Sequence, residues 1–243
     1  VHTDGETITH TTDAPLTVGE TVDGCLDWPA RLDAMQQHTG EHILSGALHR
    51  LFGAENVGFH IGSPYVRMDT SIPLTPEQLA QAEAEANAAF EAQKQKIETL
   101  EPMQENVTVA MFYITSKGAL YVRNNGDYMV KMLELAGGQY APEGLGDGES
   151  GTRQMEMEAF YLAAGDADCI LYIGQLGGRP ETLAQLLERN ALLADFKAVQ
   201  NRRVYCTGAD YFQQAGRLGD LIEDMNRMLS GDDAALTHIM KLE

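Results

Sequence analysis

Residues 107–138 read VTVAMFYITSKGALYVRNNGDYMVKMLELAGG, and this stretch decides the fold of the larger part of the chain. Val107–Ile114 is a run of apolar and β-branched residues typical of a buried strand, and Ala119–Arg123 is a second strand. Asp127–Ala136 has helical spacing and is closed by Gly137-Gly138. The stretch therefore predicts two strands followed by a helix.

The remaining residues to 243 continue this alternation of strands and helices. The pattern predicts a glycine-rich loop over Gln139–Arg153, helices over Gln154–Ala164, Glu181–Arg189 and Arg217–Leu229, and strands over Cys169–Ile173 and Arg203–Cys206. Strands separated by helices pair in parallel and carry the helices on both faces of the sheet. The sequence therefore predicts a doubly wound, Rossmann-like α/β lobe.

The first hundred residues have a different pattern. Apolar residues at three- and four-residue steps predict a helix over Arg31–Phe52, and two strands follow at Val57–Ile61 and Tyr65–Met68. Thr75 is an N-cap with Pro76 at the first helical position, so a second helix starts there and runs to about Thr99. This part is predicted to be α+β.

Charge and composition exclude several classes of protein. The chain has 36 Asp and Glu against 17 Lys and Arg, a net charge of −19, and residues 1–90 hold only Arg31, Arg50 and Arg67 as basic residues. Binding to nucleic acid through counterion release needs clustered basic residues, so the charge disfavours tRNA as a partner. No run approaches the roughly 20 apolar residues that span a bilayer.

The sharpest local motif is His38-Thr39-Gly40-Glu41-His42. Histidines at i and i+4 of a helix lie about one turn apart on the same face, which suits two ligands of one zinc ion. The alternative is a pair of surface or core histidines without a metal. Glu41, between the two, is the one catalytic candidate.

Residues 7–89 resemble the AlaX-type alanyl-tRNA editing domain. The resemblance lies in Asp27-Trp28, Arg31, Met35, the His38–His42 motif, Gly58–Gly62, Asp69 and Asn87. It implies a zinc-dependent hydrolase that removes Ser or Gly from mischarged alanine tRNA. In that family a later C-x-x-x-H completes the zinc site, and here it is missing: the residues four positions after the three cysteines are Pro29, Ile173 and Asp210.

Residues 107–243 resemble the C-terminal lobe of the solute-binding proteins of ABC importers for iron chelates, haem or cobalamin. The matching segments include Val107–Ile114, Leu135–Gly138, Ala167–Ile170 and Arg203–Thr207. In that family a long helix joins two lobes, and the ligand lies in the cleft between them. The resemblance implies a metal-chelate ligand, an ABC permease as partner, and no cofactor in this lobe. Glu158 matches the glutamate that docks onto the permease, although an acidic residue in a first helical turn is also ordinary complementation of the helix dipole.

Open α/β sheets bind ligands at the carboxyl ends of their strands. The loops expected there nominate six ligand-binding residues: Lys117, Arg123, Tyr128, Arg153, Arg179 and Tyr211, with Asp210 beside the last. Arginine suits recognition of carboxylates and tyrosine offers stacking area.

Taken together, the sequence predicts an editing-domain-like α+β fragment at 1–89, a connecting helix and linker at 76–104, and an α/β solute-binding lobe at 105–243. Binding is favoured over catalysis, so the chain is interpreted as an ABC-importer component for an iron chelate or similar complex. Two alternatives remain: a zinc-dependent aminoacyl-tRNA hydrolase, and a non-functional chimeric fusion. Localisation stays open, extracytoplasmic and lipid-anchored for binding or cytoplasmic for editing.

Overall fold

The computed structural model describes residues 2–4, 7–62, 65–146, 148–209, 211 and 215–243. Asp210 lies outside these residues. The N-terminal part contains β1 (His2–Asp4), β2 (Thr7–Thr9), α1 (Trp28–Phe52), β3 (Asn56–Ile61), β4 (Val66–Thr70) and α2 (Pro76–Glu98). The larger part, which we call the lobe, contains β5 (Thr108–Ile114), β6 (Leu120–Arg123), α3 (Tyr128–Leu135), β7 (Gln139–Ala141), β8 (Thr152–Met155), α4 (Met157–Ala164), β9 (Cys169–Tyr172), α5 (Gly174–Gly177), α6 (Leu183–Leu187), α7 (Lys197–Gln200), β10 (Val204–Thr207), α8 (Leu218–Ser230) and β11 (Ile239–Lys241), with short 3-10 turns at Ala191–Asp195, Ala215–Arg217 and Asp233–Ala235.

The lobe is built on one mixed sheet. Within the described residues its strand order is β11-β10-β9-β5-β6-β8, and β7 pairs with β5 beside β6. β7, β5, β9 and β10 run parallel, whereas β6, β8 and β11 are antiparallel to their neighbours. The predicted parallel pairing is therefore wrong for β5 and β6, and the fold is mixed α/β.

The antiparallel pairing has a local cause in the connection between β5 and β6. Only five residues separate Ile114 from Leu120, and Gly118 there has a φ of 82°, so the chain turns back as a hairpin. A parallel pair would need a crossover of a dozen residues or more. The predicted Gln139–Arg153 loop is also wrong at both ends, because β7 and the start of β8 lie in it. The helix expected from Gln154 begins only at Met157, since β8 extends to Met155.

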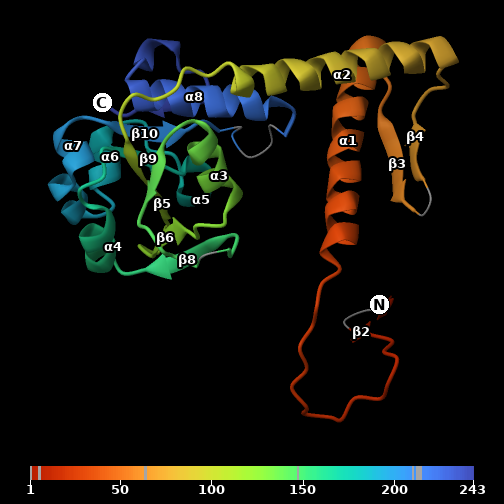
Figure 1. Ribbon diagram of the computed structural model, residues 1–243, viewed down its shortest axis with the longest axis horizontal. Coiled ribbons are helices and arrows are strands. Elements are labelled where there is room, and N and C mark those ends of the chain that lie inside the picture. The colour runs from red at the N-terminus through yellow and green to blue at the C-terminus, as the bar shows by residue number, and fades with distance from the viewer. Residues whose placement is uncertain (1, 5–6, 63–64, 147, 210, 212–214) are drawn as a thin grey trace.

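Helices cover both faces of the sheet, as predicted (Figure 1). On one face, Met111 of β5 packs in the same cluster as Leu133 of α3 and Met225 of α8. On the other face, the ring centroid of Phe112 lies 4.9 Å from that of Phe160 on α4, and Phe160 lies 5.5 Å from Phe196 in the same cluster. Alternate residues of β5 thus belong to opposite cores, as the two-residue repeat of a strand requires.

The N-terminal part is much less buried than the lobe. Figure 1 shows α2 reaching out from the lobe, with α1 and the β3–β4 hairpin at its far end. The hydrophobic cluster that holds them together has four buried members: Ala47, Leu48, Ala54 and Ala82. Thr75 caps α2 in a capping box with Gln78, so the predicted start of this helix is confirmed. None of the helices among the described residues is both long and apolar enough to cross a bilayer.

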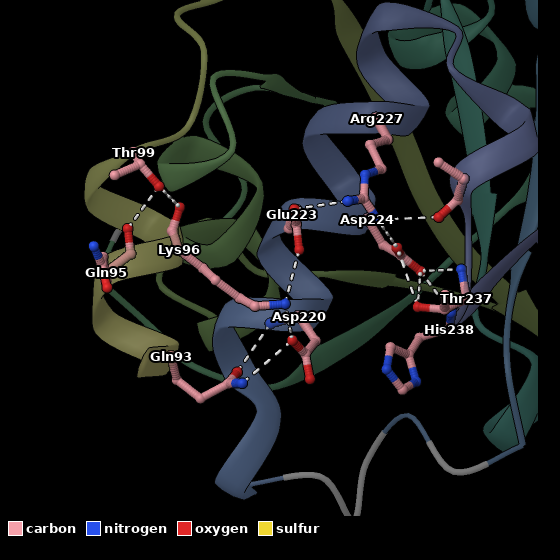
Figure 2. Close-up of polar contacts among 11 residues, drawn as sticks. Gln93, Gln95, Lys96, Thr99, Asp220, Glu223, Asp224, Arg227, Thr237 and His238 are labelled. Atoms are coloured by element: carbon pink, nitrogen blue, oxygen red, sulfur yellow. Dashed lines mark hydrogen bonds and ion pairs between the residues drawn. The ribbon is translucent and has the colours of Figure 1, made fainter. Parts of the chain in front are cut away.

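The last turns of α2 join the lobe by packing along α8 (Figure 2). Lys96 Nζ lies 2.5 Å from Asp220 Oδ1 and 3.1 Å from Glu223 Oε2. Gln93 donates through Nε2 to Asp220 Oδ1 at 3.2 Å, and its Oε1 accepts from the Asp220 backbone N–H at 3.0 Å. At Gly219 the helices approach so closely that a Cβ would overlap the carbonyl oxygen of Gln93.

A buried carboxylate at the middle of α8 fixes the start of β11. Asp224 is fully buried, and its Oδ2 accepts backbone N–H bonds from Thr237, His238 and Ile239 at 2.9, 2.5 and 3.1 Å. Arg227 lies 3.6 Å away as its counter-charge (Figure 2). These bonds attach the start of β11 to α8 and fulfil the rule that a buried charge is paired and hydrogen-bonded.

We expect Gly219→Ala to destabilise the protein by about 1–3 kcal/mol, because the added methyl forces α2 and α8 apart. Gly216→Ala is the matched control, since a Cβ there meets no atom within 4 Å. Urea denaturation followed by circular dichroism measures both. Equal stability of the two variants would contradict the close packing described above.

The pair between Lys96 and Asp220 predicts a pH dependence. Burial raises the pKa of Asp220, but hydrogen bonds from Lys96 and Gln93 outweigh it and leave that pKa below its usual value. The hydrogen bond to Asp220 raises the pKa of Lys96. The pair therefore stabilises fully above about pH 4 and below about pH 10, and its contribution is lost as pH falls through the lowered pKa of Asp220. Lys96→Met should cost stability at pH 7 and progressively less as the pH falls below about 4, as urea midpoints will show.

Candidate functional site

Three parallel strands, β5, β9 and β10, end at the same edge of the sheet, which we call the carboxyl edge. They end at Ile114, Tyr172 and Thr207. Two of the nominated ligand-binding residues lie in the segments that follow: Lys117 is exposed in the turn after β5, and Arg179 is exposed just after α5, which follows β9. Tyr211 follows β10 and is buried.

Arg123 does not lie at this edge, although the sequence placed it there. β6 runs antiparallel to β5, so Arg123 comes one residue beyond the Phe112–Val122 pair and back toward the middle of β5. It is buried, and its Nη1 lies 3.6 Å from Asp127 Oδ2. Asp127 also caps α3, accepting from the backbone N–H of Met129 at 3.0 Å, so the Arg123 charge is fixed against the start of α3.

Arg123, Tyr128 and Tyr211 are brought together in one cluster. Burial raises the pKa of Tyr128 to about 12, while the charge of Arg123 opposes the shift. Burial likewise raises the pKa of Tyr211. The neighbouring Tyr128 raises it further, and the charge of Arg123 lowers it. A phenol with its ordinary pKa of about 10 is already protonated at neutral pH, and these upward shifts keep both so, which lets them donate hydrogen bonds beside a buried cation.

Arg153 and Glu158 lie on the β8–α4 side of the lobe. Arg153 donates through Nε to Asn124 Oδ1 at 2.7 Å and through Nη2 to Glu149 Oε2 at 3.0 Å. It therefore holds the loop after β6 against the glycine-rich segment. Glu158 is exposed in the first turn of α4, where the sequence analysis expects an acidic docking residue.

The second candidate site lies on α1. His38 and His42 have ring centroids 4.6 Å apart, and His38 stacks on Phe59 of β3 at 5.8 Å. One ligand atom from each of His38, Glu41 and His42 lies within 4.8 Å of the others. The two predicted metal ligands are thus brought together, and Glu41 is added to them.

Glu41 is held in place by neighbours. Its side chain is 5% exposed, and Oε2 lies 3.3 Å from His42 Nδ1. Asn56 donates to Oε1 at 2.5 Å, and the Ser45 hydroxyl donates to the same atom. Two imidazoles and a carboxylate fit a zinc site with three protein ligands, the number that catalytic zinc sites use.

Sequence reasoning missed the residues that order the carboxyl edge. The Thr207 hydroxyl accepts from the Gly174 backbone N–H at 3.0 Å and donates to Gln175 Oε1 at 2.6 Å, which links the ends of β9 and β10. Arg189 follows α6 and donates to the same region from the other side. In the sequence pattern Thr207 directly follows a predicted strand and Arg189 ends a predicted helix, so no motif marks either residue.

Comparison with known proteins identifies the lobe. The family model described as periplasmic binding protein matches residues 75–211, which begins at the cap of α2 and extends past β10. The chain belongs to the periplasmic binding protein family. The predicted resemblance is therefore confirmed, and the match includes the whole of α2.

The N-terminal part matches curated editing proteins over short segments. The chain is 38% identical over 69 residues to the alanyl-tRNA editing protein AlaX-L of Pyrococcus horikoshii, which covers 28% of this chain and 17% of that protein. It is 34% identical over 79 residues to Aarsd1 of Mus musculus, covering 32% and 19%. The chain spans less than a fifth of the length of these relatives.

Two solved structures with similar folds are periplasmic proteins. One is a possible iron-binding (periplasmic solute-binding) protein from Staphylococcus epidermidis, 15% identical, with a TM-score of 0.48 over 63% of this chain and 56% of that one. The other is the periplasmic haem-binding protein HutB of Vibrio cholerae, 17% identical, with a TM-score of 0.48 over 60% and 59%.

Proposed function

We propose that α2 and the lobe form the C-terminal half of a solute-binding protein of an ABC importer, and that its ligand is a metal chelate. The family match over residues 75–211 carries this proposal. The permease would be its partner, with the exposed Glu158 as one docking residue.

The proposed ligand contacts are the six nominated side chains. The Arg123–Tyr128–Tyr211 cluster offers a buried cation beside two protonated phenols, while Lys117 and Arg179 add exposed positive charge at the carboxyl edge. Arg153 contributes by fixing the loop that follows Arg123. Cations and hydrogen-bond donors suit the carboxylate and catecholate oxygens of a chelate, and tyrosine adds stacking area.

Calorimetric titration with haemin, ferric citrate and ferrichrome tests this proposal. We expect at least one of the three to bind the native chain, and Tyr128→Phe to weaken it by about tenfold through loss of a hydroxyl donor. Tyr161→Phe, on α4 at the opposite face of the sheet, is the matched control and should bind as the native chain does. Binding of none of the three probes would overturn the proposal.

The second candidate function rests on the cluster of His38, Glu41 and His42. We propose that these three residues bind zinc, and that the N-terminal part is a hydrolase of the alanyl-tRNA editing kind. Zinc in such a site supplies an activated water and polarises a carbonyl. Asn56 and Ser45 would orient Glu41, as outer hydrogen bonds orient metal ligands elsewhere.

Metal analysis of protein purified without a histidine tag tests the zinc site. We expect about one zinc per native chain and less than about 0.1 in His38→Ala, because a site that loses one of three ligands loses its metal. His49→Ala is the matched control: it lies on the same helix, is exposed and pairs with Glu55 instead. Deacylation of Ser-tRNA(Ala) should follow the zinc content across the three proteins. Equal zinc in the two variants would contradict the assignment.

A further inference from the structure

Arg189 follows α6, is half-buried and donates hydrogen bonds to groups at the carboxyl edge. Its Nη1 donates to the Tyr172 hydroxyl at 2.7 Å and to the carbonyl oxygen of Gly177, and its Nη2 donates to the carbonyl oxygen of Gly178 at 3.0 Å. The guanidinium carbon lies 5.2 Å from the centre of the Tyr172 ring. One side chain from outside the sheet thus holds β9 and the turn that follows it.

Tyr172 extends this network to β5. Its hydroxyl accepts from the Ile114 backbone N–H at 3.2 Å and lies 3.2 Å from the Ile114 carbonyl oxygen, to which it donates. A Cβ on Gly177 would overlap this hydroxyl and lie 2.8 Å from the same carbonyl oxygen. The approach is so close that only glycine fits, so α5 is pressed directly onto the ends of β5 and β9.

The other end of α5 is attached to β10. The hydroxyl of fully buried Thr207 accepts from Gly174 and donates to Gln175. The four residues of α5 are therefore fixed at both ends, to β10 through Thr207 and to β5 and β9 through Arg189. Arg179 follows directly and is exposed.

Lys117, Arg179 and Arg189 place three positive charges at this edge in a chain of net charge −19. In the described part of the chain the Arg189 guanidinium bonds to three carbonyl oxygens and a hydroxyl, not to a carboxylate. Burial raises the pKa of the Cys206 thiol to about 11, and the nearby charges of Arg179 and Arg189 oppose that shift. A partly buried cation that is hydrogen-bonded but not neutralised favours an anionic group nearby.

We propose that Arg189 is a positioning residue for ligand binding. It holds α5 as a preformed wall of the ligand site, so that Arg179 is presented in a fixed place, and its charge selects an anionic chelate. This inference rests on the proposed solute-binding function. Preformed sites bind more tightly because less ordering is required on binding.

The test compares Arg189→Met with the matched control Arg203→Met. Arg203 also donates to two carbonyl oxygens, those of Met228 and Leu229, but it lies at the opposite edge of the sheet, just before β10. Amide hydrogen exchange read by mass spectrometry follows residues 174–179, and calorimetry follows haemin, ferric citrate and the uncharged chelate ferrichrome. Melting temperature reports the global loss of stability in both variants.

We expect Arg189→Met to speed amide exchange at α5 by about 10- to 100-fold. It should also weaken the binding of haemin and of ferric citrate by about 10- to 100-fold, as for loss of hydrogen bonds to a charged group. Guanidinium chloride at a low, non-denaturing concentration should restore the slow exchange at α5 and the binding of the anionic probes, because the ion can occupy the position that the Arg189 guanidinium has vacated. Arg203→Met should lower the melting temperature without either effect.

Unchanged α5 exchange in Arg189→Met would overturn the inference. The inference would also be overturned if Arg189→Met and Arg203→Met lost affinity equally and guanidinium did not restore it. It would be overturned as well if Arg189→Met weakened ferrichrome as much as the anionic probes. If the native chain binds none of the three probes, the proposed solute-binding function is wrong. The exchange rate of α5 and its rescue by guanidinium then decide by themselves whether Arg189 holds α5 in place.

Discussion

The close packing of α2 against α8 is the constraint on which the arrangement of the whole chain depends. Gly219 allows the two helix backbones to meet, and Lys96 and Gln93 fix their register through Asp220. α1 packs on α2 and also contacts the 3-10 turn at Ala215–Arg217, so this junction helps to determine where α1 and the β3–β4 hairpin lie relative to the lobe. The family match over residues 75–211 includes α2 together with most of the lobe.

The lobe achieves its stability and its candidate site with separate sets of residues. Apolar side chains of β5 and β9 fill two cores, one on each face of the sheet. At the carboxyl edge, polar side chains bind backbone groups that the sheet no longer pairs: Tyr172 to Ile114, Thr207 to Gly174, and Arg189 to Gly177 and Gly178. Buried polar groups of this kind cost free energy unless each finds a partner, which explains why each of these side chains binds a particular backbone group.

Local patterns in the sequence predicted most elements but not the direction of all strands. The Thr75-Pro76 cap and the apolar runs at Val107–Ile114 and Cys169–Ile173 identify their elements, because capping and burial act on neighbouring residues. Strand direction depends on connection length: the short Thr115–Gly118 turn forces the antiparallel pair, and the alternation of strands and helices does not reveal it. The role of Arg189 cannot be predicted from the sequence for a different reason: its partners include backbone carbonyl groups, which carry no residue-specific signal. The His38–His42 pair was visible because both ligands lie on one helix.

The small cluster around Ala82 has a consequence for how the chain unfolds. Four buried residues stabilise the packing of α1 and the hairpin on α2, against two extensive cores in the lobe. Parts with few buried apolar contacts open at lower free energy than the rest of a protein. We therefore expect α1 and the β3–β4 hairpin to open at lower free energy than the lobe, while α2 stays docked on α8. Denaturation of the chain should then proceed in two steps, the first without any loss of the sheet.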